Sequence, residues 1–516
     1  MGKKTKDKKK GKGAEKTAQK TEKKLSAKQK KQLQAIGEDD IETILKQIED
    51  EENKRQQVTE HIVEPPSRRI NFSFVAHPEK EELVLYGGEF HNGQKTFVYN
   101  DLYFYNIPNN TWTVVKAPKG PPPRCGHQMI ASSTNKGQLW VFGGEYTSPS
   151  ENQFYHYRDL WLYHLAAKKW EKITTPNGPS ARSGHRMVYS KKQIFVFGGF
   201  HDNSRDYKYF NDIYTFNTES YKWLKLEPTG TAPAPRSGCC MVALQDGRIL
   251  IYGGYSKEKI KKDVDKGHVY TDAFILQPDK NDTTGTKYKW VTTKLGGVTF
   301  APRCSMPLTT APNNTSYCFG GVYDTTDEDE ELAGVFYNDM HMLDLEKLVW
   351  RSVNIRGKQD VTKPRRKQND SDDDNPDSAD HIDEEVTKKV ETTTISDDGV
   401  FKVTIGPAPT ATTSTSASTN NTNQIFQPSP RLNCGLAIKH GVLYLYGGMY
   451  EDGDKEITFQ DFYALDLKKL EEWNTIIQDD VKSSEWLATP DNSDDDEEES
   501  SNDDSASEDE ESMETD

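Results

Sequence analysis

Six times along this chain, a short run of apolar residues ends in two consecutive glycines. The segments read VLYGG, LWVFGG, IFVFGG, LIYGG, YCFGG and LYLYGG. Their paired glycines are Gly87 and Gly88, Gly143 and Gly144, Gly198 and Gly199, Gly253 and Gly254, Gly320 and Gly321, and Gly447 and Gly448. Short apolar runs bounded by glycine are typical of buried strands, and a glycine there allows a sharp turn or the close approach of another backbone. The repetition predicts an array of similar β units.

Three further signals accompany each glycine pair in a fixed order. A turn with proline and arginine precedes the first strand, as in PPRCGHQMI at 122–130, and an aspartate opens the third strand, as in NDLYFYNI at 100–107. A tryptophan marks a fourth strand: Trp112, Trp170, Trp223, Trp290, Trp350 and Trp473. Four short strands predict one antiparallel sheet per unit, and such sheets cover both faces by packing around a common axis. We expect the tryptophans between the sheets.

Together, the paired glycines, the tryptophan and the Arg-x-Gly entry resemble the kelch repeat, a family of β-propellers. The resemblance implies an all-β fold, a six-bladed kelch-type β-propeller, with blades 1–5 in residues 61–352 and blade 6 in 429–488. It also implies that arginines at the entry can hold acidic groups of peptide ligands. The candidates are Arg124, Arg182, Arg236 and Arg303, although Ser305 replaces the glycine after Arg303. The alternative is structural, because an arginine in every blade can also satisfy nearby carbonyl groups.

Strand direction predicts which end of the propeller binds partners. The connections between second and third strands share one end with the links between blades. Most long segments belong there, among them 145–158, 200–211, 255–271 and 322–338. Long loops on a rigid scaffold are common binding sites, so we expect partners at this end. We expect His127 and His185, inside first strands, to pack within the blades.

Composition separates the blades from the rest of the chain. Residues 1–38 are rich in lysine and predict a disordered tail. Residues 39–60 predict a short helix with an aspartate cap, and this helix either packs on the propeller or docks on a partner. Residues 353–428 predict a charged, Ser/Thr-rich disordered insert, and 489–516 an acidic disordered tail that dominates the net charge of −16. Either 61–63 or the segment around Trp486 could add an outer strand. Candidate phosphorylation sites are Ser371, Ser493 and Ser507.

Several functional classes find no support in the sequence. No apolar run approaches the roughly 18–20 residues that span a bilayer, and the first residues lack the apolar core of a secretory signal. The six cysteines show no CxxC spacing and no Cys/His pair at ligand spacing, so we expect buried reduced thiols and no bound metal. We therefore expect an intracellular protein, cytoplasmic, nuclear or both, with the nucleolus included. Its lysine-rich tail can contact nucleic acid nonspecifically.

The favoured function is a non-catalytic protein–protein interaction scaffold. Its expected partners are other proteins, with acidic peptides as candidates, and we expect no cofactor and no small-molecule substrate. The alternative is a substrate receptor of a cullin-type ubiquitin ligase, by analogy with kelch proteins that carry an adaptor domain. A propeller enzyme is less favoured, because no phosphate-binding glycine loop and no convergent catalytic set is visible.

Overall fold

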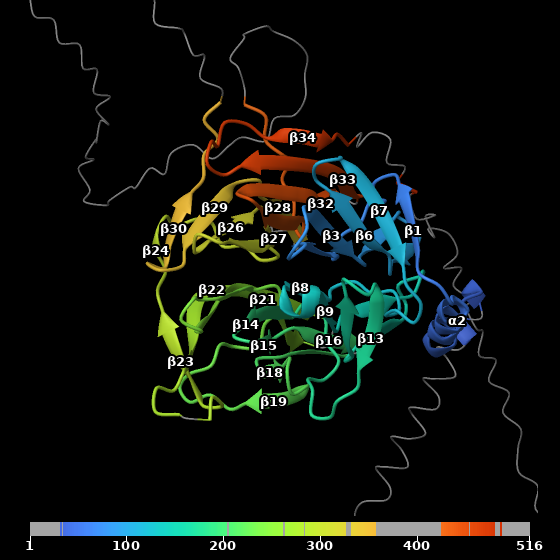
Figure 1. The fold of residues 1–516 in the computed structure, drawn as a ribbon, viewed down its shortest axis with the longest axis horizontal. Coiled ribbons are helices and arrows are strands. Elements are labelled where there is room, and N and C mark those ends of the chain that lie inside the picture. The colour runs from blue at the N-terminus through green and yellow to red at the C-terminus, as the bar shows by residue number, and fades with distance from the viewer. Residues whose placement is uncertain are drawn as a thin grey trace, which may run out of the picture. The chain divides into compact units, whose positions relative to one another are not determined.

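Six sheets of four or five strands form the core of the protein (Figure 1). The computed structural model describes residues 31–33, 35–203, 206–261, 264–282, 284–326, 332–357, 425–453, 455–479 and 486–487. We call the sheets blades 1 to 6 in chain order. In each blade, four strands lie side by side in sequence order and pair antiparallel. The β-propeller class that the sequence predicts is confirmed.

The strand bounds follow from the first strand of each blade to the fourth. Blade 1 contains β2 (Ser73–Ala76), β3 (Glu82–Tyr86), β6 (Leu102–Asn106) and β7 (Thr111–Lys116). Blade 2 contains β8 (Gln128–Ser132), β9 (Gln138–Phe142), β12 (Leu160–His164) and β13 (Lys169–Ile173). Blade 3 contains β14 (Arg186–Ser190), β15 (Gln193–Phe197), β18 (Ile213–Asn217) and β19 (Lys222–Leu226).

In the second half of the ring, blades 4 and 6 have long second and third strands. Blade 4 contains β20 (Cys240–Ala243), β21 (Ile249–Lys261), β22 (Val264–Pro278) and β23 (Tyr288–Thr293). Blade 5 contains β25 (Leu308–Ala311), β26 (Thr315–Phe319), β29 (Met340–Asp344) and β30 (Val349–Ser352). Blade 6 contains β31 (Gly435–Lys439), β32 (Val442–Asp452), β33 (Lys455–Asp466) and β34 (Asn474–Ile477).

The first strands of the blades contact one another in a closed ring. β2 lies against β8, β8 against β14, β14 against β20, β20 against β25, β25 against β31, and β31 against β2. All strands of blade 1 come from the N-terminal part of the described chain, and all strands of blade 6 from its C-terminal part. The ring therefore closes without any exchange of strands between its first and last blades.

Side-chain contacts hold the first blade against the last. The hydroxyl of Tyr446 donates to the carbonyl of Pro66 at 2.7 Å, and the Asn433 amide donates to the side chain of Asn71 at 2.9 Å. Arg68 forms two hydrogen bonds with the carboxylate of Asp479, at 2.5 and 2.6 Å. A bidentate ion pair of this kind is among the stronger polar contacts in proteins.

Additional elements extend two blades and precede the ring. β1 (Thr59–Val63) pairs antiparallel with β7 as a fifth strand of blade 1, so the outer strand expected at 61–63 is present. The segment at Trp486 instead contacts a hairpin of blade 1, where the Leu487 amide donates to the Asn92 carbonyl at 2.9 Å. β24 (Gly296–Gly297) runs parallel to β30. The helix α2 (Ile41–Asn53) begins at its cap Asp40, and a short 3₁₀ turn covers Thr134–Lys136.

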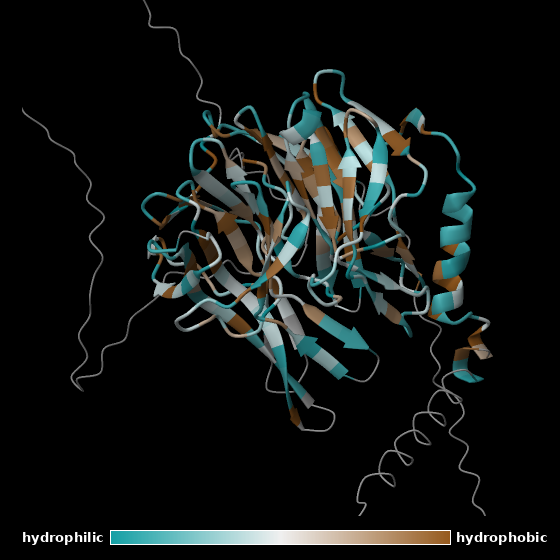
Figure 2. Cartoon of the chain, turned by 60° about the horizontal axis from the view of Figure 1, so that its bottom comes forward, coloured by the Kyte–Doolittle hydropathy of each residue, from teal (hydrophilic) through white to brown (hydrophobic). Residues whose placement is uncertain are grey.

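Every repeated tryptophan packs against the preceding blade. Its partner there is the aromatic residue just before the glycine pair, with ring centroids 5.4 to 6.1 Å apart. The pairs are Trp170 with Tyr86, Trp223 with Phe142, Trp290 with Phe197, Trp350 with Tyr252, Trp473 with Phe319, and Trp112 with Tyr446. All six tryptophans are buried. Figure 2 shows the apolar residues concentrated on the strands, as expected if burial between blades stabilises the ring.

The paired glycines hold the backbone of one blade against the next. All twelve have positive φ, between 58° and 108°. A Cβ on Gly143 would lie 2.7 Å from the carbonyl oxygen of Arg182 in the following blade, and one on Gly320 would lie 2.3 Å from that of Arg431. No other residue fits such a position without displacing backbone atoms.

Several sequence predictions lie outside the described residues. These include Ser371, Ser493 and Ser507, most of 1–38, nearly all of 353–428, and 489–516. The six cysteines are described, and all are buried and free of disulfide bonds. Among the described helices, none has both the length and the apolar character required to cross a lipid bilayer.

Candidate functional site

Each blade extends at one end into a small β-hairpin, formed where the second strand connects to the third. Separate hairpins are β4 (Glu89–His91) with β5 (Thr96–Val98), β10 (Glu145–Thr147) with β11 (Phe154–His156), β16 (Phe200–Asn203) with β17 (Asp206–Tyr209), and β27 (Val322–Thr326) with β28 (Leu332–Phe336). In blades 4 and 6, the long strands β21–β22 and β32–β33 continue through the glycine pair into the hairpin. We call this the hairpin end of the protein.

Isolated bridges attach each hairpin to the link that enters its own blade. We call the arginine that precedes the first strand of each blade the entry arginine. In every blade, a β-bridge joins the residue after the glycine pair to the residue after the entry arginine. The pairs are Ile70–Glu89, Cys125–Glu145, Ser183–Phe200, Ser237–Tyr255, Cys304–Val322 and Leu432–Met449. The second-to-third connections and the links between blades therefore meet at the same end, and the long connections expected there fold as hairpins.

Neighbouring hairpins also contact one another around the ring. The amide of Thr96 donates to the carbonyl of Pro149 at 3.0 Å, which joins the hairpins of blades 1 and 2. The Tyr207 hydroxyl donates to Asp265 at 2.9 Å between blades 3 and 4. The hairpin end is thus a continuous surface rather than a set of separate loops.

The four candidate arginines lie buried at this end of their blades. Each guanidinium group forms two hydrogen bonds with the aspartate that opens the third strand of the same blade. The pairs are Arg124 with Asp159, Arg182 with Asp212, Arg236 with Asp272, and Arg303 with Asp339. Each also donates to the carbonyl of the first paired glycine of its blade, at 3.0 to 3.3 Å, and lies over an aromatic ring.

These contacts favour the structural role of the arginines over peptide contact. Arg124, Arg182 and Arg236 are 0% exposed and Arg303 is 6% exposed, so a peptide meets almost none of their surface. Their charge is balanced by the paired carboxylates. The contacts therefore assign these four arginines to support of the hairpins rather than to peptide binding, because their guanidinium groups already have hydrogen-bond partners inside the blade.

The aspartate partners are the site residues that the sequence reasoning missed. Burial alone would raise the pKa of Asp339, but hydrogen bonds from His341 and Arg303 outweigh burial and lower this pKa to about 2. The same pair recurs in blade 6 between Arg431 and Asp461. An arginine and an aspartate each recur once per repeat at one end of the blade, and this recurrence of opposite charges is the signal that could identify the pair.

The residue two positions after each entry arginine has a left-handed backbone in all six blades. Glycine occupies the position in blades 2, 3 and 4, where Gly126, Gly184 and Gly238 have φ of 59° to 60°. Asn71, Ser305 and Asn433 occupy it in the other blades, with φ of 54°, 55° and 47°. The Arg-x-Gly pattern thus reports a backbone conformation, which asparagine and serine also adopt here.

These six residues line a channel of about 700 Å³ that the first strands surround. Glu145 and Phe200, which begin the hairpins of blades 2 and 3, line it too. The channel is therefore continuous with the hairpin end.

Carboxyl groups follow one another around the hairpin end. Five of them, Glu89, Glu145, Asp324, Glu451 and Glu456, have a raised pKa. Burial is the main cause in every case. A neighbouring carboxyl group raises the pKa further for four of the five. The pKa of Glu145 is raised by Glu89 and Asp202, and the pKa of Glu89 is raised by Glu151. The pKa of Glu451 is raised by Asp324, and the pKa of Glu456 is raised by Glu151 and Glu451. We call Asp324, Glu451, Glu456, Glu151, Glu89, Glu145 and Asp202 the acidic arc.

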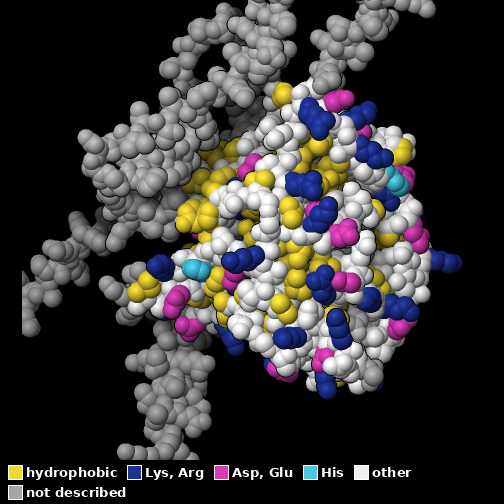
Figure 3. All heavy atoms as spheres, turned by 90° about the vertical axis from the view of Figure 1, so that its left-hand side faces the viewer, with side chains coloured by type: hydrophobic (Ala, Val, Ile, Leu, Met, Phe, Trp, Pro, Cys, Tyr) yellow, Lys and Arg dark blue, Asp and Glu magenta, His cyan; other side chains and the backbone are white. Residues whose placement is uncertain are grey.

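Few described cations offset the acidic arc. His91 lowers the pKa of Glu89 and Glu456, and Lys257 that of Asp324. By contrast, the flank of the ring at β23, β24 and β30 carries side chains of both signs among apolar patches (Figure 3). The hairpin end therefore combines the long connections with a local excess of negative charge.

The two histidines in first strands are packed inside the ring. His127 lies 5.2 Å from the ring of Tyr86, and His185 lies 5.2 Å from that of Phe142. Burial lowers the pKa of His127 to about 3 and that of His185 well below its ordinary value. Both side chains are neutral packing groups at physiological pH.

The start of α2 also rests on the hairpin end. The amide of Ile41 donates to the side chain of Gln153 at 2.9 Å, and Gln153 donates to Glu38 at 2.9 Å. The Ser150 amide donates to Glu38 at 3.1 Å. These contacts place the beginning of the helix against the hairpin of blade 2, which is the packing alternative of the two expected for this segment.

Residues 69–283 match the protein family described as "FBX42, beta-propeller domain". Among curated proteins, Host cell factor of Drosophila melanogaster is 28% identical over 305 residues, which are 54% of this chain and 18% of that protein. Kelch domain-containing protein 3 of Homo sapiens is 30% identical over 180 residues, 34% of this chain and 45% of the relative.

A flagellar outer-arm dynein alpha chain of Chlamydomonas reinhardtii is 28% identical over 264 residues, 48% of this chain and 5% of the relative. The chain thus spans less than half the length of each of these relatives.

Proposed function

We propose that this chain, whose repeat region is similar to kelch proteins, is a non-catalytic scaffold that binds partner proteins at its hairpin end. Propellers of this type generally serve as interaction domains rather than enzymes. Six hairpins anchored to their own blades provide a broad and rigid surface. Rigid surfaces lose little conformational entropy on binding, which favours affinity.

The acidic arc is the single observation that carries the chemistry of the partner. A surface with clustered carboxylates attracts lysine and arginine side chains and repels acidic ones. Acidic peptides require accessible arginines, but the guanidinium groups of Arg124, Arg182 and Arg236 are buried and paired. We therefore propose a basic segment of a partner protein as the ligand of the hairpin end.

Desolvation strengthens this argument. Glu89 and Glu145 are held with raised pKa by burial and by their neighbours, so their ionised forms lack sufficient counter-charge. A cationic side chain placed between such groups would supply it, and charge-assisted hydrogen bonds contribute about 1.5–3 kcal/mol each.

The ligase-receptor alternative rests on analogy with other kelch proteins. It requires an adaptor domain that links the propeller to a cullin, and the helix α2, which precedes the ring, has thirteen residues. Recovery of a cullin with the full-length protein from cells would favour this alternative over a simple scaffold.

Selection from a random peptide library on the full-length protein tests the proposed ligand. We expect enrichment of lysine and arginine, and an affinity that falls as salt rises, because exposed charges are screened. Enrichment of acidic peptides, or selection without any charge preference, would contradict the proposal.

Glu151, which is exposed, and Glu456, which is half-buried, provide the matched variants. Glu151→Gln with Glu456→Gln removes two charges at the hairpin end, and we expect about tenfold weaker binding of a selected basic peptide. Glu171→Gln with Glu219→Gln removes two charges from exposed glutamates that pair with His164 and Lys192 away from the arc, and we expect unchanged binding. Equal effects of the two double variants would show that only the overall net charge matters.

A further inference from the structure

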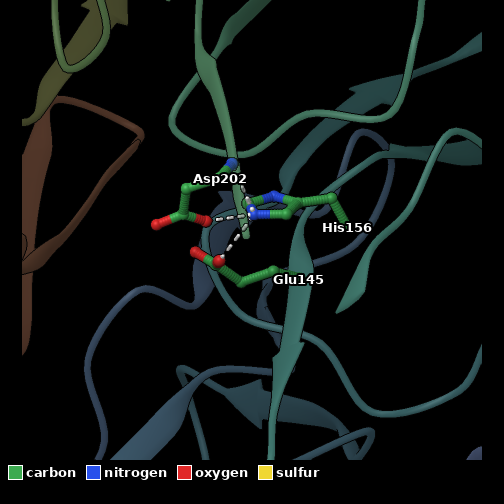
Figure 4. Close-up of side chains that lie close together, drawn as sticks. All are labelled: Glu145, His156 and Asp202. Carbon is green, nitrogen blue, oxygen red and sulfur yellow. Dashed lines mark hydrogen bonds and ion pairs between the residues drawn. The ribbon is translucent and has the colours of Figure 1, made fainter. Parts of the chain in front are cut away.

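Glu145, His156 and Asp202 converge at the hairpin end between blades 2 and 3 (Figure 4). One oxygen of each carboxylate and one nitrogen of the imidazole all lie within 4.8 Å of one another. The Nε2 atom of His156 is 2.5 Å from Oδ1 of Asp202 and 3.4 Å from Oε2 of Glu145. Three potential metal ligands thus share one small volume.

The local fold fixes all three side chains. Glu145 on β10 and His156 on β11 face each other as a cross-strand pair, which sets their Cβ atoms about 4.5–5.5 Å apart. Asp202 lies on β16, in the neighbouring hairpin of blade 3. Ligands held by strands rather than by free loops keep the geometry that a bound ion requires.

The neighbours of His156 require its Nε2 atom both to donate and to accept a hydrogen bond. Its Nδ1 atom lies 2.8 Å from the hydroxyl of Ser183. Its Nε2 atom faces two carboxylates, which require a donor, yet the backbone amide of Asp202 also points at Nε2 from 3.2 Å, which requires an acceptor. The ring has one proton to place when it is neutral, so no arrangement of that proton satisfies every neighbour.

Burial sharpens the imbalance of charge. The side chain of His156 is 1% exposed, that of Glu145 15%, and that of Asp202 34%. Two carboxylates therefore face a single imidazole in a mostly enclosed place. An added cation at the common focus of the three atoms would balance both carboxylates.

We propose that Glu145, His156 and Asp202 bind one divalent transition-metal ion of the zinc type, which joins the hairpins of blades 2 and 3. Histidine nitrogen with carboxylate oxygens is a ligand set that zinc accepts, whereas magnesium and calcium prefer oxygen ligands alone. Asp202 opens the site toward solvent, which leaves room for a water molecule or a partner's side chain as the fourth ligand.

Ser183 acts as a positioning residue for this site. A histidine that binds a metal through Nε2 commonly donates its Nδ1 proton to a nearby oxygen, which fixes the ring orientation. The Ser183 hydroxyl lies where that oxygen is required. A bound metal would thus remove the clash between the two carboxylates and an unprotonated Nε2, because Nε2 becomes a ligand while Nδ1 keeps the proton.

Zinc binding to the untagged full-length protein tests the proposal. We expect one Zn²⁺ per chain in a competition titration against a chromogenic chelator, and no effect of Mg²⁺ or Ca²⁺ in excess. Zn²⁺ should also raise the unfolding temperature, since an ion that binds only the folded state stabilises it. Absence of saturable zinc binding would overturn the proposal.

Asp202→Asn is the variant of choice, because this side chain is partly exposed and its loss endangers the fold least. We expect at least about 100-fold weaker zinc binding and no thermal shift with Zn²⁺, since even loss of an indirect partner costs 10–100-fold. Ser183→Ala should retain one ion per chain with about tenfold weaker binding. His164→Gln, in an exposed pair with Glu171, serves as the control and should bind like the wild type.

X-ray absorption of the zinc-loaded protein identifies the ligands directly. We expect only nitrogen and oxygen neighbours at about 2.0–2.2 Å. A sulfur shell near 2.3 Å would place the ion on cysteines and would overturn the assignment. Peptide binding is not a readout in these experiments, so their outcome is independent of the proposed docking function.

Discussion

Arg431 and Asp461 form a bidentate ion pair inside blade 6, with nitrogen–oxygen distances of 2.5 and 2.8 Å. Their side chains are 0% and 3% exposed, so both charges are removed from water. The guanidinium group also donates to the carbonyl of Gly447 at 2.9 Å. One pair therefore connects the entry of the blade, the glycine turn and the start of the third strand.

Loss of one partner of this pair should destabilise the protein strongly. Arg431→Met leaves the carboxylate of Asp461 buried without a counter-charge, which costs about 3–5 kcal/mol. Urea unfolding followed by circular dichroism measures the change. The control is Arg351→Met, because Arg351 is 56% exposed and 3.9 Å from Asp344, and we expect a loss below about 1 kcal/mol. Similar losses in the two variants would contradict the structural role of the entry arginines.

The tryptophan contacts between blades predict a second large effect. Trp223 is 9% exposed and lies 5.5 Å from Phe142 of the preceding blade. Trp223→Ala should lower the free energy of unfolding by about 3–5 kcal/mol, because it leaves a cavity between two sheets. Trp223→Phe keeps part of the contact and should cost less. An alanine variant as stable as the wild type would show that the contact between blades 2 and 3 contributes little.

The left-handed position predicts a stabilising substitution. Ser305 has φ of 55°, where the same position in blade 4 holds Gly238 with φ of 59°. Ser305→Gly removes a steric cost of about 1–2 kcal/mol and adds freedom to the unfolded chain, so we expect a net gain of about 0.5 kcal/mol. Gly238→Ser is the reverse change and should destabilise the protein. The two unfolding midpoints, measured side by side, should move in opposite directions.

His77 predicts a dependence of stability on pH. Its Nδ1 atom accepts hydrogen bonds from the amides of Glu79 and Lys80, at 3.1 and 2.9 Å, so the folded protein needs the neutral ring. Burial, with the charges of Lys80 and Lys439, lowers the pKa of His77 from 6.5 to about 4. A lowered folded pKa means that the contribution is complete above pH 6.5 and is lost as the pH falls through about 4.

His77→Asn retains an acceptor but does not titrate. Between pH 6.5 and pH 4.5, the unfolding midpoint of the wild type should therefore fall more steeply than that of the variant. Parallel curves would mean that His77 has the same pKa in the folded and unfolded chains. An NMR titration of the histidine ring signals checks the folded pKa directly.

Local patterns were sufficient to predict the strands and the contacts between blades. Each glycine pair lies at the end of a strand and each tryptophan lies in or beside one. Their positions in the repeat therefore indicate which neighbouring residues they contact. The entry arginines were harder to interpret, because Arg124 and Asp159 are separated by 35 residues and meet only after the blade folds. The repeat indicates both residues, but only the tertiary structure pairs them.

The metal-binding cluster has no signal of this kind. Glu145 and His156 meet through the register of one hairpin, and Asp202 comes from the next blade. Ligand motifs in sequences depend on fixed short spacings within one turn or helix. Residues from two neighbouring hairpins share no such spacing, which explains why the sequence predicted no metal.

The closure of the ring has a consequence for how the chain can be cut. Tyr446 donates to Pro66 across the joint between the last and first blades, as Tyr86 donates to Pro121 between blades 1 and 2. The contact between the last and first blades, where the ring closes, is thus of the same kind as the contact between two consecutive blades. A circular permutant that starts at another blade boundary, with the present ends linked, would retain every one of these contacts.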